Sequence, residues 1–524
     1  VALARDAVIS KEEAILRIDP PVLNELLHRR IDPRATRHLF ASGIAASPGA
    51  ATGRLVFSSR EAQAMASRDE PSILVRRETS PEDVRGMHAA VGVLTEKGGA
   101  SSHAAVIARG LGLPCVVGAE LKLRRREETL TASDGRVLRA GDIVTLDGST
   151  GQVLVGEVAL LEPSLGDGFK TLMHWADEIK DIGVRANADT PEEAKTARAF
   201  GASGIGLCRT EHMFFDESRL TVMREMIFAD TAEDRDAALA RLLPMQRDDF
   251  IRIFEIMEGQ PVCIRLLDPP LHEFLPTERD AQRDLAEALG KPMSDISRRV
   301  AELTEYNPML GLRGVRLGIY LPAIYDMQAR AIFEATVALQ NTGTQVAPEV
   351  MIPLVSAKRE VELVKSRIDA VAASVRTETG TGFSYTLGVM VETPRAALRA
   401  HEIAPNASFL SFGTNDLTQM TYGLSRDDAG RFMGSYVRQG VFAEDPFHHM
   451  DLEGVGELVK LGAERGRAGN AAVTLSICGE HGGDPAAIGF VRDAGFDYVS
   501  CSAFRVPGAK LAAAQLAARI PPKP

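Results

Sequence analysis

One histidine in a run of small residues is the side chain best placed for chemistry in this sequence. His103 follows two glycines and two serines in the segment TEKGGASSHAAVIARGLGLPCVVG, residues 95–118. The alanine-rich stretch after it predicts a helix that Ser101 or Ser102 would cap. A helix N-terminus presents unpaired N–H groups and the positive end of the helix dipole, which favour an anion such as phosphate. The segment alone fits a phosphate-carrying histidine and an ordinary histidine beside a helix cap equally well.

A second set of polar residues follows short apolar strands in the C-terminal part of the chain. In a barrel of parallel strands, the C-terminal strand ends all face one mouth, where active sites are built. This coincidence at six strands favours an active site over a barrel with ordinary solvated loops. The groups are Arg185, Arg209-Thr210-Glu211, Arg265 with Asp268, Glu392, Gly413-Thr414-Asn415-Asp416 and Cys478-Gly479-Glu480.

The arginines and carboxylates of this set predict an anionic substrate and a metal ion. Arg185, Arg209 and Arg265 would supply forked donors that match carboxylate and phosphate groups. Glu392 and Asp416 are hard oxygen ligands that suit Mg²⁺, which takes few protein carboxylates and completes its shell with water and substrate.

An amide and a thiol complete the predicted chemistry. Asn415 could donate a hydrogen bond to a developing oxyanion. Cys478 could donate a proton, since a thiol has an ordinary pKa of about 8.5, although a buried cysteine often serves packing alone. Together the set predicts phosphorylated enolate chemistry. Magnesium and arginines would stabilise an enolate, an acid would protonate its carbon, and a phosphoryl group would pass to a histidine on another domain.

The predicted secondary structure that must position these residues differs from one part of the chain to the next. Residues 1–40 look helical and polar, and residues 41–160 predict a compact α/β domain of short strands with the His103 helix. Residues 161–180 contain the turn-rich EPSLGDG and predict a hinge linker. Residues 181–524 alternate strands and helices and predict a (β/α)8 barrel, with an open doubly wound sheet as the alternative.

Eight barrel strands are expected from short apolar runs between helical stretches. They are Gly183–Ala186, Gly204–Cys208, Val262–Leu267, Glu349–Leu354, Leu387–Val391, Phe409–Phe412, Thr474–Ile477 and Tyr498–Cys501.

Composition narrows the class of protein. The 524 residues carry a formal net charge of -11 with both signs interspersed, which argues against nucleic acid as a partner. No apolar run reaches the ~20 residues of a membrane-spanning helix, and no signal peptide is recognised. The 5 scattered cysteines predict a reduced, cytoplasmic protein and no disulfide framework or zinc site. The chain starts with Val1, so we expect a processed protein or a fragment.

Several longer segments resemble the phosphoenolpyruvate-utilising enzymes, and among them the pyruvate phosphate dikinases. The resemblance covers almost the whole chain and implies a swivelling phosphohistidine domain before the barrel. The segments are GGASSHAAVIARGLGLPCVVG, GIGLCRTEHMFF, IRLLDPPLHEFLP, NPMLGLRGVRLG, VMVETPRA, FGTNDLTQMTYGLSRDD, ICGEHGGDP and YVSCSAFRVP.

The resemblance implies a role for each candidate residue. His103 would be the phosphohistidine and Cys478 the proton donor, while the arginines 185, 209 and 265 would bind phosphate and carboxylate. Glu392 and Asp416 would hold Mg²⁺, and residues 413–415 would line the pocket for pyruvate or phosphoenolpyruvate. Ser101 stands where the family usually has a threonine that some members phosphorylate, so a regulatory kinase or phosphorylase is a further implied partner. A homodimer through the barrel is also implied.

Two related families share these domain types: enzyme I of the sugar phosphotransferase system and phosphoenolpyruvate synthase. Three segments look like the dikinases instead: EHMF at residues 211–214, LLDPPLHEFLP, and EHGG at residues 480–483. One feature departs from the family, because no ATP-grasp domain is recognised and residues 1–40 look like its last helices. We therefore expect this chain to catalyse only the half-reaction between phosphoenolpyruvate and His103. A non-catalytic phosphoryl carrier with a degenerate barrel is the hypothesis from another class.

Overall fold

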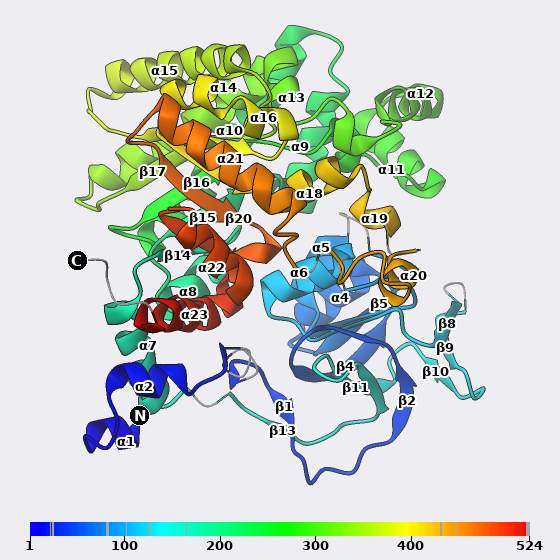
Figure 1. Ribbon diagram of the computed structural model, residues 1–524. Coiled ribbons are helices and arrows are strands. Elements are labelled where there is room, and N and C mark those ends of the chain that lie inside the picture. The colour runs from blue at the N-terminus through cyan, green and yellow to red at the C-terminus, as the bar shows by residue number, and fades with distance from the viewer. Residues whose placement is uncertain are drawn as a thin grey trace.

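The computed structural model shows two α/β units, one containing His103 and the other a closed barrel (Figure 1). It describes residues 1–20, 23, 26–79, 83–100, 102–124, 127–163, 165–429, 432–447 and 449–519. The predicted fold class is therefore confirmed. Ser101, the predicted regulatory residue, lies outside the described residues. We call residues 39–155 the N-terminal unit and residues 167–519 the barrel unit.

The N-terminal unit is built on a mixed sheet whose central strands are parallel and whose outer strands are antiparallel. Side chains alternate between its faces along each strand. On β5, Ile73 and Val75 join the core of one face, and Leu74 packs on the other face with the helices. The sheet order is β2 (Leu39–Ser42), β12 (Gln152–Val155), β11 (Ile143–Asp147), β4 (Ala50–Val56), β5 (Ser72–Arg76), β6 (Gly92–Thr95), β7 (Cys115–Val117) and β3 (Ile44–Ser47).

Three helices cover one face of this sheet: α4 (Ser59–Ala66), α5 (Val84–Ala89) and α6 (His103–Leu111). The other face packs against a three-stranded antiparallel sheet that the sequence analysis missed. Its strands are β8 (Leu121–Arg124), β9 (Thr129–Ala132) and β10 (Val137–Arg139). Charged residues crowd this segment, so only its few buried leucines, such as Leu130, marked the apolar face.

Eight parallel strands close the barrel in the described part of the chain. Because β21 pairs with β14, the sheet has no edge, and the open doubly wound alternative is wrong. All the predicted strands are present. Their bounds are β14 (Gly183–Asn187), β15 (Ile205–Arg209), β16 (Pro261–Arg265), β17 (Ala347–Ile352), β18 (Thr386–Val391), β19 (Phe409–Gly413), β20 (Thr474–Cys478) and β21 (Tyr498–Ser502).

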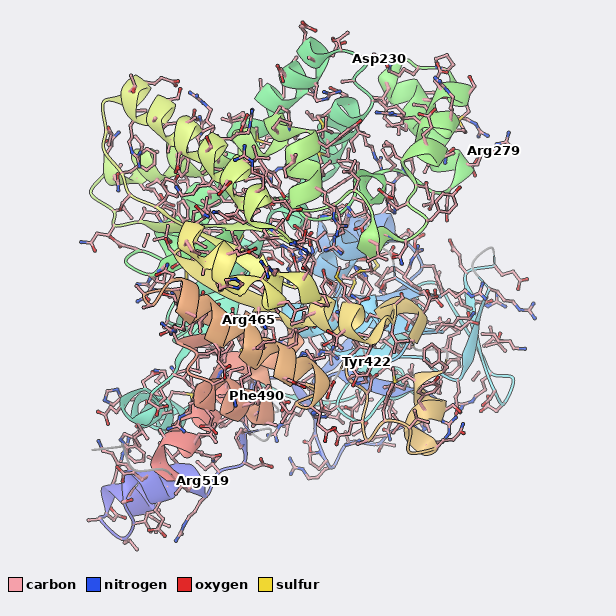
Figure 2. The ribbon with its side chains drawn as sticks, turned by 45° about the horizontal axis from the view of Figure 1, so that its top comes forward. Asp230, Arg279, Tyr422, Arg465, Phe490 and Arg519 are labelled. Carbon is pink, nitrogen blue, oxygen red and sulfur yellow. The ribbon has the colours of Figure 1, made fainter. Side chains whose placement is uncertain are left out.

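Helices surround the barrel, and their apolar faces form one continuous core with the strands. A helical pair, α11 (Arg279–Leu289) and α12 (Met293–Leu303), is inserted between β16 and β17, with Arg279 at the edge of the molecule (Figure 2). None of the described helices combines the length and apolar composition needed to cross a lipid bilayer. The longer barrel helices are α8 (Pro191–Ala199), α9 (Glu217–Ile227), α10 (Ala232–Ile256), α14 (Pro322–Gln340), α15 (Lys358–Thr379), α18 (Thr414–Tyr422), α21 (Gly454–Gly469), α22 (Pro485–Asp493) and α23 (Val506–Arg519).

Residues 1–40 are only partly helical. Helices α1 (Ala2–Arg5) and α2 (Lys11–Leu16) are followed by strand β1 (Arg30–Ile31), and β2 belongs to the main sheet of the N-terminal unit. Helix α2 packs on the barrel unit, where the side chain of Gln515 donates to the Ile15 carbonyl at 2.9 Å. The polar composition of residues 30–40 hid these strands, since each buries few side chains.

The segment predicted as a hinge divides into a strand and a helix. Strand β13 (Leu160–Leu161) pairs antiparallel with β1, so the two connections between the units run side by side. Helix α7 (Asp167–Ile179) buries Trp175 against the end of α23 and belongs to the barrel unit.

Candidate active site

The mouth of the barrel and the start of α6 enclose a cavity of about 1290 Å³, including its opening to solvent. His103 enters from the N-terminal unit. The barrel contributes Arg209, Arg265, Glu392, Asn415, Asp416 and Cys478. The structure thus brings the predicted histidine and most of the predicted strand-end residues into one space.

His103 is the first residue of α6, and its neighbours set the state of its ring. The hydroxyl of Thr79 lies 3.1 Å from Nδ1. Burial, helped by the positive charges of His212, Arg426 and Arg209, lowers the pKa of His103 to about 4 against the opposing charge of Asp83. The ring is therefore neutral near neutral pH, and a neutral imidazole nitrogen can act as a nucleophile.

Helix α6 begins as predicted, but its cap differs. Ser102 occupies the N-cap position, yet its side chain makes no capping hydrogen bond. Its buried hydroxyl has no hydrogen-bond partner among the described residues. The preceding loop is held by Arg109, which donates to the carbonyls of Ala100 at 2.8 Å and Ala46 at 3.0 Å.

Arg209 and Arg265 lie at the cavity, each held by carboxylates. Arg209 donates from Nε to Asp189 at 2.9 Å, and its backbone N–H donates to the same carboxylate at 2.7 Å. Arg265 pairs with Asp268 at 2.9 Å and with Glu211. The carboxylates fix both guanidinium groups, which suits them to hold an anion in one orientation.

Arg185 does not share this position. Its guanidinium pairs with Glu349 of β17 at 2.7 Å and lies over the ring of Tyr498, 3.9 Å from the centroid. It is absent from the described lining of the cavity. The structure therefore does not bring Arg185 together with the other two arginines, because a partner on a strand across the barrel holds it elsewhere.

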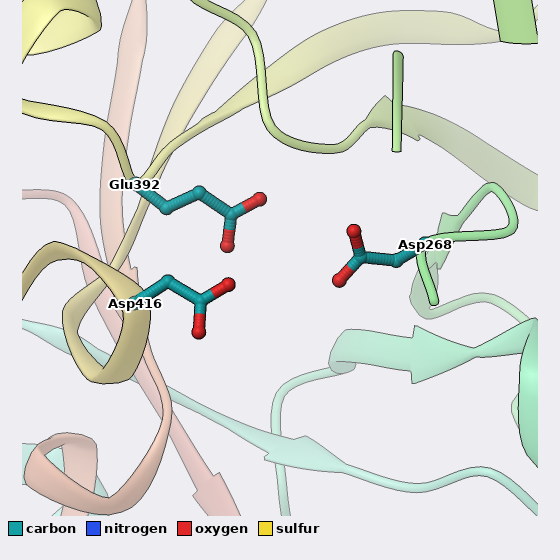
Figure 3. A group of neighbouring side chains, drawn as sticks. All are labelled: Asp268, Glu392 and Asp416. Carbon is teal, nitrogen blue, oxygen red and sulfur yellow. The ribbon is translucent and has the colours of Figure 1, made fainter. Parts of the chain in front are cut away.

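Three carboxylates converge at the mouth. Asp268, Glu392 and Asp416 offer oxygen atoms that all lie within 4.8 Å of one another. In Figure 3 Glu392 and Asp416 lie side by side, and Asp268 points toward them from the opposite side. Burial raises the pKa of Glu392 well above its usual range, and the charges of Asp416 and Asp268 raise it further. Such a cluster favours a cation, and oxygen ligands at this spacing suit Mg²⁺.

The loop after β17 supports Glu392. The backbone N–H of Leu354 donates to its carboxylate at 2.6 Å. Leu354 has a φ of 57°, which is unusual for a residue with a side chain and costs on the order of 1–3 kcal/mol. The surrounding packing therefore holds a strained residue in the position that orients Glu392.

The sequence analysis missed Arg313, which bridges this carboxylate cluster. Its guanidinium donates to Asp268 at 2.6 Å and to Asp416 at 2.9 Å. Arg313 lies in the loop between the inserted helices and α13 (Val315–Tyr320), away from any strand end. The only signal for it was its place within the segment NPMLGLRGVRLG.

The remaining predicted residues form the floor of the cavity. Gly413 and Asn415 line it, whereas Thr414 is buried behind them and donates to the Cys478 carbonyl at 3.2 Å. Cys478 also lines the cavity, and the hydroxyl of Ser411 donates to its sulfur at 3.5 Å. Burial raises the pKa of the Cys478 thiol to about 11, which keeps it protonated near neutral pH.

Comparison with known protein families gives one match in the N-terminal unit and one in the barrel unit. The profile of the PEP-utilising enzyme, mobile domain matches residues 68–151, and that of the PEP-binding domain matches residues 165–518. Curated relatives named pyruvate, phosphate dikinase come from Rhizobium meliloti (56% identity over 98% of this chain), Mesembryanthemum crystallinum (50%, 98%) and Clostridium symbiosum (47%, 98%). The chain spans 58%, 55% and 59% of the length of these relatives.

Proposed function

We propose that this chain, which belongs to the family of PEP-utilising enzymes, transfers a phosphoryl group between phosphoenolpyruvate and His103, with pyruvate as the other product. One observation supports this most strongly. His103 of the N-terminal unit lines the same cavity as the arginines, the carboxylates and Cys478 of the barrel mouth.

In the direction of pyruvate formation, His103 is the nucleophile. Its Nδ1 is engaged by Thr79, which leaves Nε2 to attack phosphorus. The phosphorus–oxygen bond to the enol breaks, and the electron pair stays on the enolate oxygen. Arg209 and Arg265 hold the phosphoryl and carboxylate groups of the substrate, and Asn415 donates to the enolate oxygen.

Cys478 then protonates the methylene carbon of the enolate and gives pyruvate. Its raised pKa keeps the proton on sulfur until the basic carbanion accepts it. Ser411 and Thr414 orient this residue from within the barrel. The sequence assigns Arg185 to substrate binding together with Arg209 and Arg265. Because Arg185 pairs with Glu349 inside the barrel, we propose that it contributes to the substrate site indirectly.

The carboxylates fit a magnesium ion. Glu392 is buried with a raised pKa beside Asp416, so a cation there would relieve unfavourable charge. We assign Glu392 and Asp416 as its ligands, because Asp268 is already paired with two arginines. When bound, Mg²⁺ would supply charge stabilisation to the enolate oxygen.

We extend the proposal to the whole protein. An ATP-grasp domain would deliver a phosphoryl group to His103, so that ATP, phosphate and pyruvate give AMP, pyrophosphate and phosphoenolpyruvate. The named relatives support this overall reaction. A homodimer through the barrel, a cytoplasmic location and a regulatory kinase or phosphorylase acting on Ser101 complete the proposal.

Phosphorylation from labelled phosphoenolpyruvate tests the half-reaction. With Mg²⁺ the chain should acquire a label that is lost in acid and stable in base, as expected of phosphohistidine. His103→Ala should acquire none. Absence of label on the unmutated chain, or its persistence in His103→Ala, would overturn the proposal. Magnesium-dependent exchange of the pyruvate methyl protons separates an active barrel from a non-catalytic phosphoryl carrier.

A further inference from the structure

A second histidine lies at the cavity, and the proposed reaction gives it no role. His212 belongs to the short helix Thr210–Phe214 directly after β15. Its side chain is 15% exposed, and it lines the cavity together with His103 and Arg209. Both histidines therefore line the cavity in which the proposed transfer takes place.

Asp189 orients the ring of His212. The Nδ1 atom lies 2.8 Å from the Asp189 carboxylate, which is itself buried and also holds Arg209. A carboxylate accepts only, so the proton of His212 is on Nδ1 and the ring presents Nε2 elsewhere. In the neutral ring Nε2 carries a lone pair, and in the imidazolium it carries a second N–H donor.

The two histidines are close enough to influence each other. The charge of His212 is the largest effect after burial in lowering the pKa of His103. The groups facing His212 are Asp189 and Arg209, His88 of α5, Glu193 of α8 and His103 of α6. The carboxylate of Asp189 compensates a positive charge on its ring, whereas burial and the charge of Asp189 raise the pKa of Glu193 to about 7.

We propose that His212 is a second catalytic histidine, whose Nε2–H in the imidazolium form donates a hydrogen bond to the phosphoryl group as it passes between phosphoenolpyruvate and His103. The proposal rests on the proposed half-reaction. Phosphorus exchanges the enol oxygen for Nε2 of His103, and no bond to His212 is made or broken. His212 keeps both protons throughout and stabilises the equatorial oxygens with Arg209.

Two substitutions separate this role from a purely structural one. In His212→Asn the amide nitrogen takes the place of Nδ1 and can still contact Asp189. In His212→Gln the amide nitrogen takes the place of Nε2 and can still reach the phosphoryl group. If His212 acts only by holding Asp189, His212→Asn should be the more active variant. If His212 acts on the phosphoryl group, His212→Gln should be the more active variant.

The experiment is single-turnover phosphorylation of the 524-residue chain by saturating labelled phosphoenolpyruvate, followed by rapid quenching. His212→Asn should slow transfer about 10²-fold, the usual effect of losing one transition-state donor, and His212→Gln should stay within about tenfold of the unmutated rate.

His88→Asn is the matched control, because His88 lies across the same interface without lining the cavity. It should retain the unmutated rate within about twofold. Three results would overturn the role of His212. These are faster transfer in His212→Asn than in His212→Gln, an unchanged rate in both variants, and an equal loss of rate in His88→Asn. Failure of the unmutated chain to label at all would instead count against the half-reaction itself.

Discussion

At the scale of single residues, burial acts on His103 and Cys478 in opposite directions for one reason. It disfavours the charged form of each group, lowering the pKa of the imidazole to about 4 and raising that of the thiol to about 11. Near neutral pH the histidine is therefore an unprotonated nucleophile and the cysteine a protonated acid. The proposed reaction needs both groups in these states.

Replacing Cys478 should separate proton transfer from phosphoryl transfer. In Cys478→Ala, solvent deuterium should enter the pyruvate methyl group about 10²-fold more slowly, as for loss of a general acid. Nuclear magnetic resonance follows the exchange directly. Cys501→Ala removes another buried barrel cysteine that does not line the cavity and should exchange normally. Unchanged exchange in Cys478→Ala would reduce Cys478 to a packing role.

Removing one carboxylate should weaken magnesium binding. In Glu392→Gln we expect the affinity for Mg²⁺, measured by calorimetry without substrate, to fall by about tenfold or more, because an anionic oxygen ligand is lost. Glu402 pairs with Arg399 and does not line the cavity, so Glu402→Gln serves as the control. Equal affinities of the two variants would contradict the assignment of Glu392 as a ligand.

At the scale of elements, the end of α6 fits the end of β21. Gly112 ends the helix in the left-handed region with a φ of 67°, and a Cβ atom there would collide with the ring of Phe504. The ring of His28 also stacks on Phe504, with centroids 4.9 Å apart. This contact joins the connecting segment, the N-terminal unit and the barrel, and it holds the start of α6 over the mouth.

Gly112→Ala should therefore impair docking of α6 more than folding. We expect phosphorylation of His103 to fall about tenfold or more, because the added methyl group displaces Phe504. Gly290→Ala introduces the same left-handed strain, about 1 kcal/mol, at a helix end with open space around it and should phosphorylate normally. In a double-mutant cycle, Gly112→Ala should cost less activity in the Phe504→Ala background than in the unmutated chain; an equal cost would show that strain, not collision, causes the loss.

At the scale of the whole molecule, His103 is docked at the mouth of the barrel. Two antiparallel strands, β1 and β13, lie in the connections between the N-terminal unit and the barrel unit. A histidine that also visits a nucleotide site must leave this position. In the whole-protein reaction that we propose, the short paired connection would be the place of a swivel, since α7 packs in the core of the barrel unit. Two of the histidines at the interface, His28 and His103, have pKa values that burial lowers to about 4, so docking keeps them neutral near neutral pH.

Docking should therefore weaken in acid. Burial lowers the pKa of both His28 and His103 from 6.5 to about 4. Undocked, each ring titrates normally, so the stabilisation is complete above pH 6.5 and is lost as pH falls from 6.5 to about 4. The loss approaches roughly 3 kcal/mol for each histidine. Small-angle scattering should show expansion between pH 7 and pH 5, reduced in His28→Asn; an unchanged profile would contradict this reading of the interface.

Local pattern was enough to find the architecture and most of the site. The eight strands were visible as short apolar runs, and Arg209, Glu392, Asn415 and Cys478 were recognised because parallel strands bring their C-terminal ends to one mouth. The strands β8–β10 and the extended part of residues 1–40 escaped, because each buries only a few side chains among charged residues.

The local sequence pattern could not predict which residues pair with side chains from distant parts of the chain. Arg185 and Arg209 look alike in the sequence. Arg185 lies in the middle of β14 and pairs with Glu349 inside the barrel, whereas Arg209 ends β15 and pairs with Asp189 at the mouth. Arg313 enters from a loop, and His212 acquires its orientation from Asp189. The sequence by itself thus determined which residues are available for chemistry and which strands carry them. Tertiary packing decided their charge states and the docking of His103 on the barrel, because burial and opposing charges arise only when distant segments meet.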